Sequence, residues 1–194
     1  MLTYKLRSFI DINKINWDWL SCNPNAIDLL KANPDKINWI YLSKNPAAID
    51  LLKVNLDKVH WYELSSNPEA MELLITNLDK ICWNNLSSNP NAINFIEQYL
   101  NDPIVCKKLD WDILSTNPNA LPILLKYPYM INWPRFSKNP AAMSILENTM
   151  CYIDWVYLSE NSAAIDFLTA NPIAIDVESL CSNPNGIPLL LEYC

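Results

Sequence analysis

Residues 35–52 read DKINWIYLSKNPAAIDLL, and variants of this stretch recur along the whole chain. The tryptophan of this stretch, Trp39, returns every 22 residues, apart from one interval of 28 residues. The series comprises Trp17, Trp39, Trp61, Trp83, Trp111, Trp133 and Trp155, with Val177 in the eighth place. Six positions later every copy has an asparagine, and proline follows it in all copies but one. Self-similarity at a fixed period is typical of repeat proteins, so the sequence predicts eight structural repeats.

Each copy carries the signals of two short helices. Asn or Asp precedes the first large residue in six copies and is a favourable N-cap, which predicts a helix from Trp17 to about Ser21 in the first repeat. Asn23 then ends this helix and starts a second one over about Pro24–Ala32, because Asn is a good N-cap and Pro suits the first helical position. A recurring small residue, Ala26 in the first repeat, indicates close approach of neighbouring helices.

A helical hairpin of this size cannot bury its own apolar face, so neighbouring repeats must stack. The predicted fold is therefore an all-α solenoid of eight helix-turn-helix repeats, with about sixteen short helices in a single domain over residues 1–194. Residues 1–12 would form an N-terminal cap. The repeats are expected to begin near residues 13, 35, 57, 79, 107, 129, 151 and 173. The single glycine, Gly186, argues against β-hairpins and phosphate-binding loops, which need positive φ.

The fourth repeat is six residues too long, and the extra residues lie in the segment YLNDPIVCKK, residues 99–108. Asp102-Pro103 is expected to interrupt a lengthened second helix, followed by a loop or an extra turn. One interpretation is a tolerated surface insertion, which costs little free energy. The other is a bend in the solenoid or a distinct docking feature. The first interpretation is favoured.

Composition narrows the classes of function. A net charge of -7 and a pI near 4.6 argue against nucleic-acid binding, which needs a basic surface. No Lys or Arg follows Lys138, and this acidic end could attract a basic partner. No segment has the length of a membrane span, and the first residues do not resemble a secretory signal. A cytoplasmic protein that is not secreted, with free cysteines, is expected.

The string DKINW-x-x-LS-x-NP-x-AI-x-LL, taken from Asp35 to Leu52, resembles short tandem repeats of giant nucleocytoplasmic DNA viruses that infect amoebae and algae. The resemblance covers about residues 13–194. It implies an all-helical repeat protein made in the infected host cell, and it implies no activity. The insertion in the fourth repeat and the missing eighth tryptophan depart from the pattern.

Nothing in the sequence assembles an active site. His60 is the only histidine and stands where other repeats have the capping Asn or Asp, so it is interpreted as a substituted cap. A histidine cluster for a metal, or the usual Cys–His pair, cannot be built from it. Serine recurs four positions after each Trp, whereas one nucleophile needs one serine, and the tryptophans are interpreted as packing residues. We expect no enzyme, no catalytic residue, no metal and no cofactor.

The two positions after each tryptophan vary freely between repeats, and in a solenoid they would form a strip along one surface. Several are aromatic, as in binding hot spots. The predicted partner-binding residues are Trp19, Tyr41, Tyr62, Glu63, Asn85, Ile113, Arg135 and Tyr157. Alternatively, some of these aromatics pack between adjacent repeats. The leading hypothesis is a non-enzymatic protein–protein interaction scaffold. The alternatives are a helical-repeat reader of nucleic acid, which the acidic charge disfavours, and a structural component of a virion.

Overall fold

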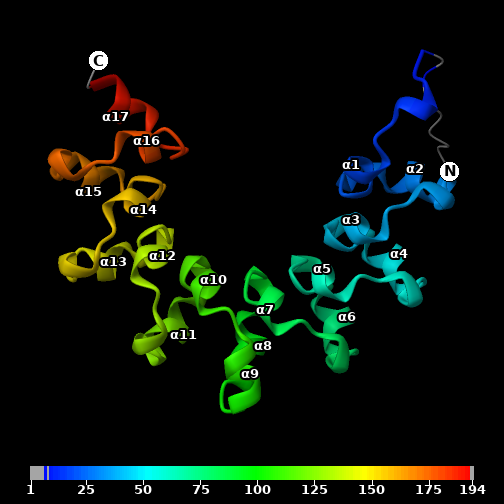
Figure 1. Cartoon of the computed structure of the whole chain (residues 1–194), viewed down its shortest axis with the longest axis horizontal. Coiled ribbons are helices and arrows are strands. Elements are labelled where there is room, and N and C mark those ends of the chain that lie inside the picture. The colour runs from blue at the N-terminus through cyan, green and yellow to red at the C-terminus, as the bar shows by residue number, and fades with distance from the viewer. Residues whose placement is uncertain (1–6, 8, 193–194) are drawn as a thin grey trace. The chain divides into compact units, whose positions relative to one another are not determined.

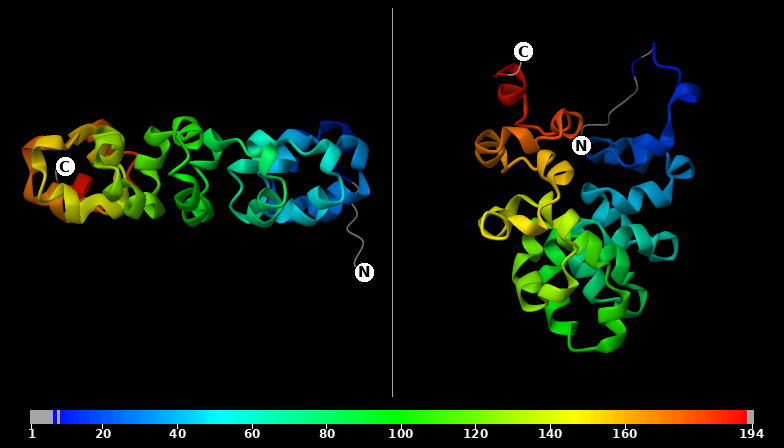
Figure 2. Two further views of the ribbon diagram at one scale, coloured as in Figure 1. Left: turned by 90° about the horizontal axis from the view of Figure 1, so that it is seen from below. Right: turned by 60° about the vertical axis from the view of Figure 1, so that its left-hand side comes forward.

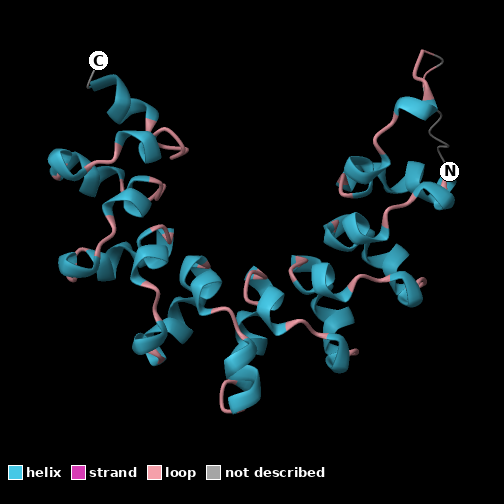
Figure 3. Ribbon diagram, viewed as in Figure 1, coloured by secondary structure: helices cyan, strands magenta, loops and turns pink. Residues whose placement is uncertain are grey.

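The structure is a computed structural model that describes residue 7 and residues 9–192, without the side chain of residue 192. Residues 1–6 and 8 of the predicted N-terminal cap, and Cys194, lie outside this part. All secondary structure in the described residues is helical, and no strand occurs there (Figure 3). The predicted all-α repeat fold is therefore confirmed.

The chain divides into two compact units, Met1–Ala92 and Ile93–Cys194. In the first unit the α-helices are α1 Trp17–Ser21, α2 Ile27–Ala32, α3 Trp39–Lys44, α4 Ile49–Lys53, α5 Trp61–Ser65, α6 Met71–Ile75 and α7 Trp83–Leu86 (Figure 1). Its 3-10 helices are η1 Ile12–Lys14, η2 Pro24–Ala26, η3 Pro34–Lys36, η4 Pro46–Ala48, η5 Leu56–Lys58, η6 Pro68–Ala70, η7 Leu78–Lys80 and η8 Pro90–Ala92.

The second unit follows the same order of elements. Its α-helices are α8 Ile93–Tyr99, α9 Pro103–Lys108, α10 Trp111–Thr116, α11 Leu121–Lys126, α12 Trp133–Ser137, α13 Met143–Leu146, α14 Trp155–Ser159, α15 Ile165–Ala170, α16 Val177–Leu180 and α17 Ile187–Glu192. Its 3-10 helices are η9 Pro118–Ala120, η10 Pro128–Met130, η11 Pro140–Ala142, η12 Met150–Tyr152 and η13 Pro172–Ala174.

The first helix of a repeat starts where the sequence predicts. In the first repeat, the side chain of Asn16 accepts a hydrogen bond from the Trp19 N–H and caps α1. The same kind of cap forms at Asn38, Asp110, Asn132, Asp154 and Asp176. His60 occupies this position in its repeat, but its side chain makes no capping bond, and its buried Nδ1 has no hydrogen-bond partner among the described residues.

The segment that the sequence predicts as one second helix forms two helices in the structure, a 3-10 helix followed by an α-helix. In the first repeat the Asn23 side chain accepts from the Asn25 N–H, and the Ala26 N–H donates to the Asn23 carbonyl. This close hydrogen bonding makes the first turn, η2, a 3-10 helix, and α2 follows it. The residues after α2 form another 3-10 turn, η3, in which the next predicted repeat begins.

Within each unit the first helices of successive repeats pack side by side. α1, α3, α5 and α7 form such a row in the first unit, and α10, α12, α14 and α16 form one in the second (Figure 1). The 3-10 turns η2, η4, η6 and η8 also contact their neighbours in series. Figure 2 shows this stacking from two further directions. The core lies between these rows, where Leu42, Leu52, Leu64 and Leu74 are fully buried.

The recurring serine ties each repeat to the next. The Ser43 hydroxyl donates to the Trp39 carbonyl one turn earlier, and it accepts from the His60 N–H of the following repeat at 3.0 Å. Ser21, Ser65, Ser115, Ser137 and Ser159 accept in the same way, each from the residue 17 positions later. These hydroxyls are buried and engaged, so their role is structural.

The recurring asparagine forms a ladder through each unit. The Asn45 side-chain amide donates to the carbonyls of Ser21 and Asn23 in the preceding repeat, both at 3.0 Å, while its oxygen accepts from the Ala47 N–H. Asn67, Asn89, Asn139, Asn161 and Asn183 repeat the pattern. The side chain therefore needs both a donor and an acceptor. Aspartate, although an equally good cap, cannot donate.

Each of these 3-10 turns ends with a small residue, and replacing it with a larger one tests how closely neighbouring repeats pack. Ala48 is fully buried in η4, which packs between η2 and η6. We expect Ala48→Leu to lower the free energy of unfolding by about 1–3 kcal/mol, because a full core must shift to accept the larger side chain. Ala47 is the matched control, since it lies in the same turn but is exposed. Ala47→Leu should change stability by no more than about 0.5 kcal/mol in a urea titration, and equal losses would contradict the predicted packing.

The insertion forms a helix of its own. α8 is lengthened to Tyr99, as predicted, and the side chain of Asp102 caps the additional helix α9 by accepting from the Ile104 N–H. The described residues therefore contain seventeen α-helices, against the about sixteen predicted. In α9, Val105 is buried and Ile104 is exposed, so the insertion is partly packed and partly presented to solvent.

None of the described helices has the length and apolar character needed to cross a membrane.

Candidate functional site

Two of the variable positions of the repeat lie on one face of the first-helix rows. We call this face the variable strip and define it by the second and fifth residues after each repeat Trp or its Val177 equivalent. The second-position residues are Trp19, Tyr41, Glu63, Asn85, Ile113, Arg135, Tyr157 and Ser179; the fifth-position residues are Cys22, Lys44, Ser66, Ser88, Thr116, Lys138, Glu160 and Ser182. Residues three apart are neighbours on a helix, so the two sets share a face.

The predicted partner-binding residues differ in exposure. Trp19 is 70% exposed and Tyr62 is 49% exposed, and Arg135 is also exposed. The other five are half-buried, namely Tyr41, Glu63, Asn85, Ile113 and Tyr157. All of them except Tyr62 belong to the strip as defined, and Tyr62 lies one residue earlier, beside Glu63.

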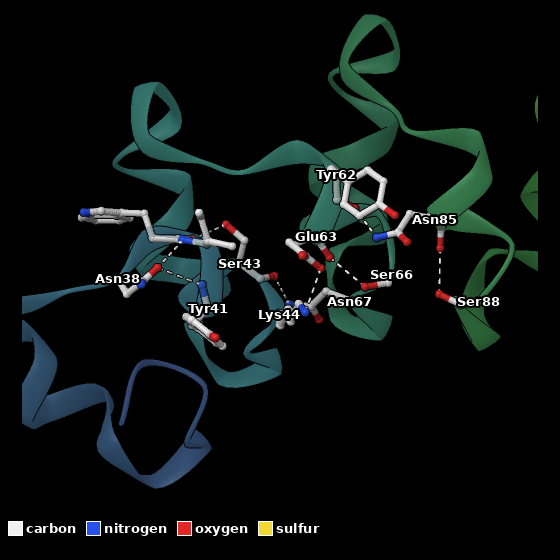
Figure 4. A network of polar contacts seen from close by, with 12 residues as sticks. Asn38, Tyr41, Ser43, Lys44, Tyr62, Glu63, Ser66, Asn67, Asn85 and Ser88 are labelled. Atoms are coloured by element: carbon white, nitrogen blue, oxygen red, sulfur yellow. Dashed lines mark hydrogen bonds and ion pairs between the residues drawn. The ribbon is translucent and has the colours of Figure 1, made fainter. Parts of the chain in front are cut away.

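In the first unit the strip residues contact one another across repeats. The rings of Trp19 and Tyr41 lie 6.3 Å apart between their centroids. Lys44 forms an ion pair with Glu63 of the next repeat, with Nζ and Oε2 3.1 Å apart. The side-chain amide of Asn85 donates to the Tyr62 carbonyl (Figure 4). The expectation that some aromatics pack between adjacent repeats therefore applies to Tyr41.

In the second unit Arg135 lies over the ring of Tyr157 in the next repeat, 5.6 Å from its centroid. Lys138 pairs with Glu160. Arg135, Lys138 and Glu160 border an open groove of about 620 Å³ along the strip. Its lining comprises Thr116, Arg135, Lys138, Pro140, Glu160, Ser162, Ser182 and Pro184. A smaller hollow of about 190 Å³, bordered by Asp110, Asp112, Ile113, Thr116 and Arg135, shares two residues with it.

The fifth-position residues were missing from the predicted site. They supply Thr116, Lys138, Glu160 and Ser182, half of the groove lining. Two signals in the sequence could have identified them. They also vary between repeats, with five residue types among the eight, and they follow the second-position residues by three residues, which is about one helical turn.

The seven repeat tryptophans are half-buried, and several of them contact a neighbouring ring or ammonium group. Trp133 stacks on Tyr152 with centroids 4.4 Å apart, and Trp155 stacks on Phe167 at 5.9 Å. The ammonium group of Lys58 lies over the Trp39 ring, 4.9 Å from its centroid. This arrangement agrees with their interpretation as packing residues.

Titratable groups with altered pKa values lie outside the strip. Hydrogen bonds to Glu72 and Glu97 raise the pKa values of Lys53 and Lys126. The backbone N–H of Ser179 lowers the pKa of Asp176, as expected for a carboxylate at a helix N-cap. Each shift has a structural cause, so none identifies a group prepared for proton transfer.

In the described part of the chain, no three His, Cys, Asp or Glu side chains gather closely enough to hold a metal ion. The strip offers charged, aromatic and hydroxyl groups spread over several repeats, which suits an extended contact with another molecule better than chemistry at one point. Comparison of the chain with protein-family models, characterised proteins and solved structures found no match.

Proposed function

We propose that this chain is a non-enzymatic protein–protein interaction scaffold that holds a protein partner along the variable strip. The observation that carries the proposal is the groove of about 620 Å³ in the second unit, which crosses successive repeats. Five of its eight lining residues stand at positions that the repeat leaves free to vary, and the other three stand at the proline position of the repeat; the five are Thr116, Arg135, Lys138, Glu160 and Ser182. Residues needed for stacking recur in every repeat, so variation at the groove lining is what selection for a particular partner would produce.

The chemistry of the strip suits a protein partner. In the first unit, Trp19 on the strip and Tyr62 beside it present large aromatic surfaces to solvent. In the second unit, Arg135 lies over the ring of Tyr157. Trp, Tyr and Arg are enriched among the residues that dominate binding energy at protein interfaces. A side chain already ordered by a neighbour also loses less conformational entropy on binding.

Nucleic acid is less well supported as the ligand. Two of the basic residues on the strip, Lys44 and Lys138, are neutralised by Glu63 and Glu160 of the next repeat. A phosphate backbone would have to displace these carboxylates, and the net charge of the chain would repel it. On the resemblance to viral repeats, we propose that the scaffold acts in the cytoplasm of an infected host cell, with a role in a virion as the alternative.

A double variant, Trp19→Ala with Tyr62→Ala, tests the proposal. Truncating an interface anchor typically costs about 2 kcal/mol, so we expect roughly thirtyfold weaker partner binding with unchanged helicity. Tyr41 and Tyr157 are left intact because they are half-buried and contact a neighbouring repeat. Partner capture by the tagged chain from host-cell extract, followed by titration of the purified partner, supplies the measurement.

The matched control is Val54→Ala with Ile75→Ala. These side chains are 76% and 49% exposed, close to the values of Trp19 and Tyr62, and they lie in the same unit but off the strip. Equal binding by both double variants and the unmodified chain would remove the strip of the first unit from the interface. Loss of helicity in the Trp19/Tyr62 variant would show that these side chains stabilise the stack.

A further inference from the structure

The first repeat leaves a stacking face open. Leu20 is half-exposed, whereas the equivalent Leu42 and Leu64 are fully buried by the repeat that precedes each of them. Beside Leu20 lies a hollow of about 240 Å³ that is also bordered by Asn23, Asn25, Ala26, Asp28 and Leu29. The residues described before the first repeat therefore do not cover this face.

Three side-chain amides on this face have no acceptor among the described residues. The side-chain oxygens of Asn16 and Asn23 accept from backbone N–H groups of the same repeat, and one of these N–H groups belongs to Asn25. Their counterparts in later repeats donate to the repeat before: Asn38 donates to the Asp18 carboxylate at 2.7 Å. Asn45 donates to two carbonyls, as described above.

The counterparts of Asn25, which lie two residues after the repeat asparagine, also donate to the preceding repeat. Asn91 donates to the Pro68 carbonyl at 2.9 Å, and Asn185 donates to the Ser162 carbonyl at 2.8 Å. Asn25 stands at the equivalent place in the first repeat. Each donor on the open face therefore has a counterpart that joins a later repeat to its predecessor, and the first repeat combines three donors that the internal interfaces use two at a time.

The eighth repeat carries the matching acceptors. Glu178 is equivalent to Asp18, and the carbonyls of Cys181, Asn183 and Pro184 are equivalent to the carbonyls that receive these amides elsewhere. In the described residues no side-chain amide reaches them. Apolar surface is also exposed to solvent on the eighth repeat. Ile187 is 60% exposed, and Leu190 is half-exposed, whereas Leu168, the counterpart of Leu190 in the seventh repeat, is fully buried.

We propose that a second copy of this chain joins the two faces, with the first repeat of one molecule stacked on the eighth repeat of another. The contact would continue the repeat-to-repeat interface seen inside each unit: Asn16 would donate to Glu178, Asn23 to the carbonyls of Cys181 and Asn183, and Asn25 to the carbonyl of Pro184. This inference does not depend on the proposed partner binding by the variable strip.

Charge favours this pairing. The described residues up to Lys36 carry four basic and four acidic side chains, whereas residues 139–194 carry seven acidic ones and no Lys or Arg. Two acidic eighth repeats repel each other, whereas the first repeat has balanced charge, so charge favours head-to-tail contact over contact between two eighth repeats. Because different surfaces meet, the association is heterologous, and it grows into open chains unless the geometry closes a ring.

One bond of the internal interface is missing. Cys181 stands where the other repeats have the serine that accepts the next backbone N–H, and a thiol is a weak acceptor. The intermolecular contact should therefore be weaker than stacking within the chain. Association that depends on protein concentration is expected.

Sedimentation velocity of the untagged chain over a wide concentration range tests the proposal, with Asn23→Asp as the diagnostic variant. Aspartate keeps the oxygen that accepts from the Asn25 N–H, so the fold is retained, but it cannot donate and repels the two carbonyls. We expect at least about tenfold weaker association from the two lost hydrogen bonds. The control is Asn101→Asp, which makes the same charge change at an exposed residue between α8 and α9.

A mixing experiment tests the direction of assembly. An Asn23→Asp chain still presents a normal eighth repeat, so it should end growing assemblies and lower the average mass of unmodified chains, whereas Asn101→Asp should not. A mass of 22.3 kDa at every concentration, including one produced by contact of the two ends within one molecule, would overturn the proposal. So would a dimer of fixed mass that Asn23→Asp leaves unchanged.

Discussion

Replacing Asn67 with aspartate is expected to lower the free energy of unfolding by about 3–5 kcal/mol, the range found when a buried charge loses its partner. Asn67 is 1% exposed, and its amide donates to the carbonyls of Ser43 and Asn45 at 3.0 and 3.1 Å. Aspartate would retain the oxygen that accepts from the Glu69 N–H. It would also place a carboxylate against two carbonyl oxygens and remove the amide that donates to both, although the Asn45 carbonyl keeps the bond from the Ala48 N–H. Urea unfolding followed by circular dichroism at neutral pH measures the loss.

The same substitution in the first repeat is the control. Asn23 caps its turn through its oxygen, but its amide reaches no preceding repeat, so Asn23→Asp should stay within about 0.5 kcal/mol at a concentration where the chain is monomeric. If both variants lost the same stability, capping alone would explain the asparagine, and the ladder would contribute nothing measurable.

A second large effect is expected at the leucine three positions after the repeat tryptophan. Leu64 is fully buried, and Leu64→Ala should lower the free energy of unfolding by about 2–5 kcal/mol, because the transfer free energy is lost and a cavity remains between stacked helices. Urea unfolding is again the measurement, and a fall in the midpoint at unchanged slope would assign the loss to the folded state.

Leu20→Ala supplies the comparison for this site. Leu20 has the same place in the first repeat, but it is half-exposed because no described repeat covers it. Its truncation should cost clearly less than that of Leu64. A larger loss at Leu20 would mean that the first repeat contributes more stability than its exposed face indicates.

The local structure of a repeat could be read from the sequence because its signals are local. The start of α1 at Trp17 follows from the Asn16 cap, and the break before η2 follows from Asn23-Pro24. The period itself predicted stacking, since one hairpin is too small to bury its apolar face. The second-position residues of the strip could be placed on one surface for the same reason.

Other features depend on groups that are distant in the sequence. The residues that bind the amide of Asn45 lie 22 and 24 positions earlier, and the N–H that Ser43 accepts lies 17 positions later. Helical periodicity relates residues three or four apart and carries no information about such pairs. Only the stacked repeats show why asparagine and serine are required where aspartate or alanine would serve a single helix equally well.

The candidate site also has features that the sequence predicts and features that only the stacked repeats show. Variation between repeats identified Arg135 and Tyr157 from the sequence, but their mutual stacking and the groove beside Lys138 and Glu160 arise only when neighbouring repeats meet. The exposure of Trp19 and the partial burial of Tyr41 likewise depend on which side chains the adjacent repeat brings near. The sequence by itself determined the period and the start of the first helix in each repeat, because capping and amphipathic spacing act within one repeat. The tertiary structure decided which polar groups pair and which face remains open, because those outcomes depend on contacts between repeats.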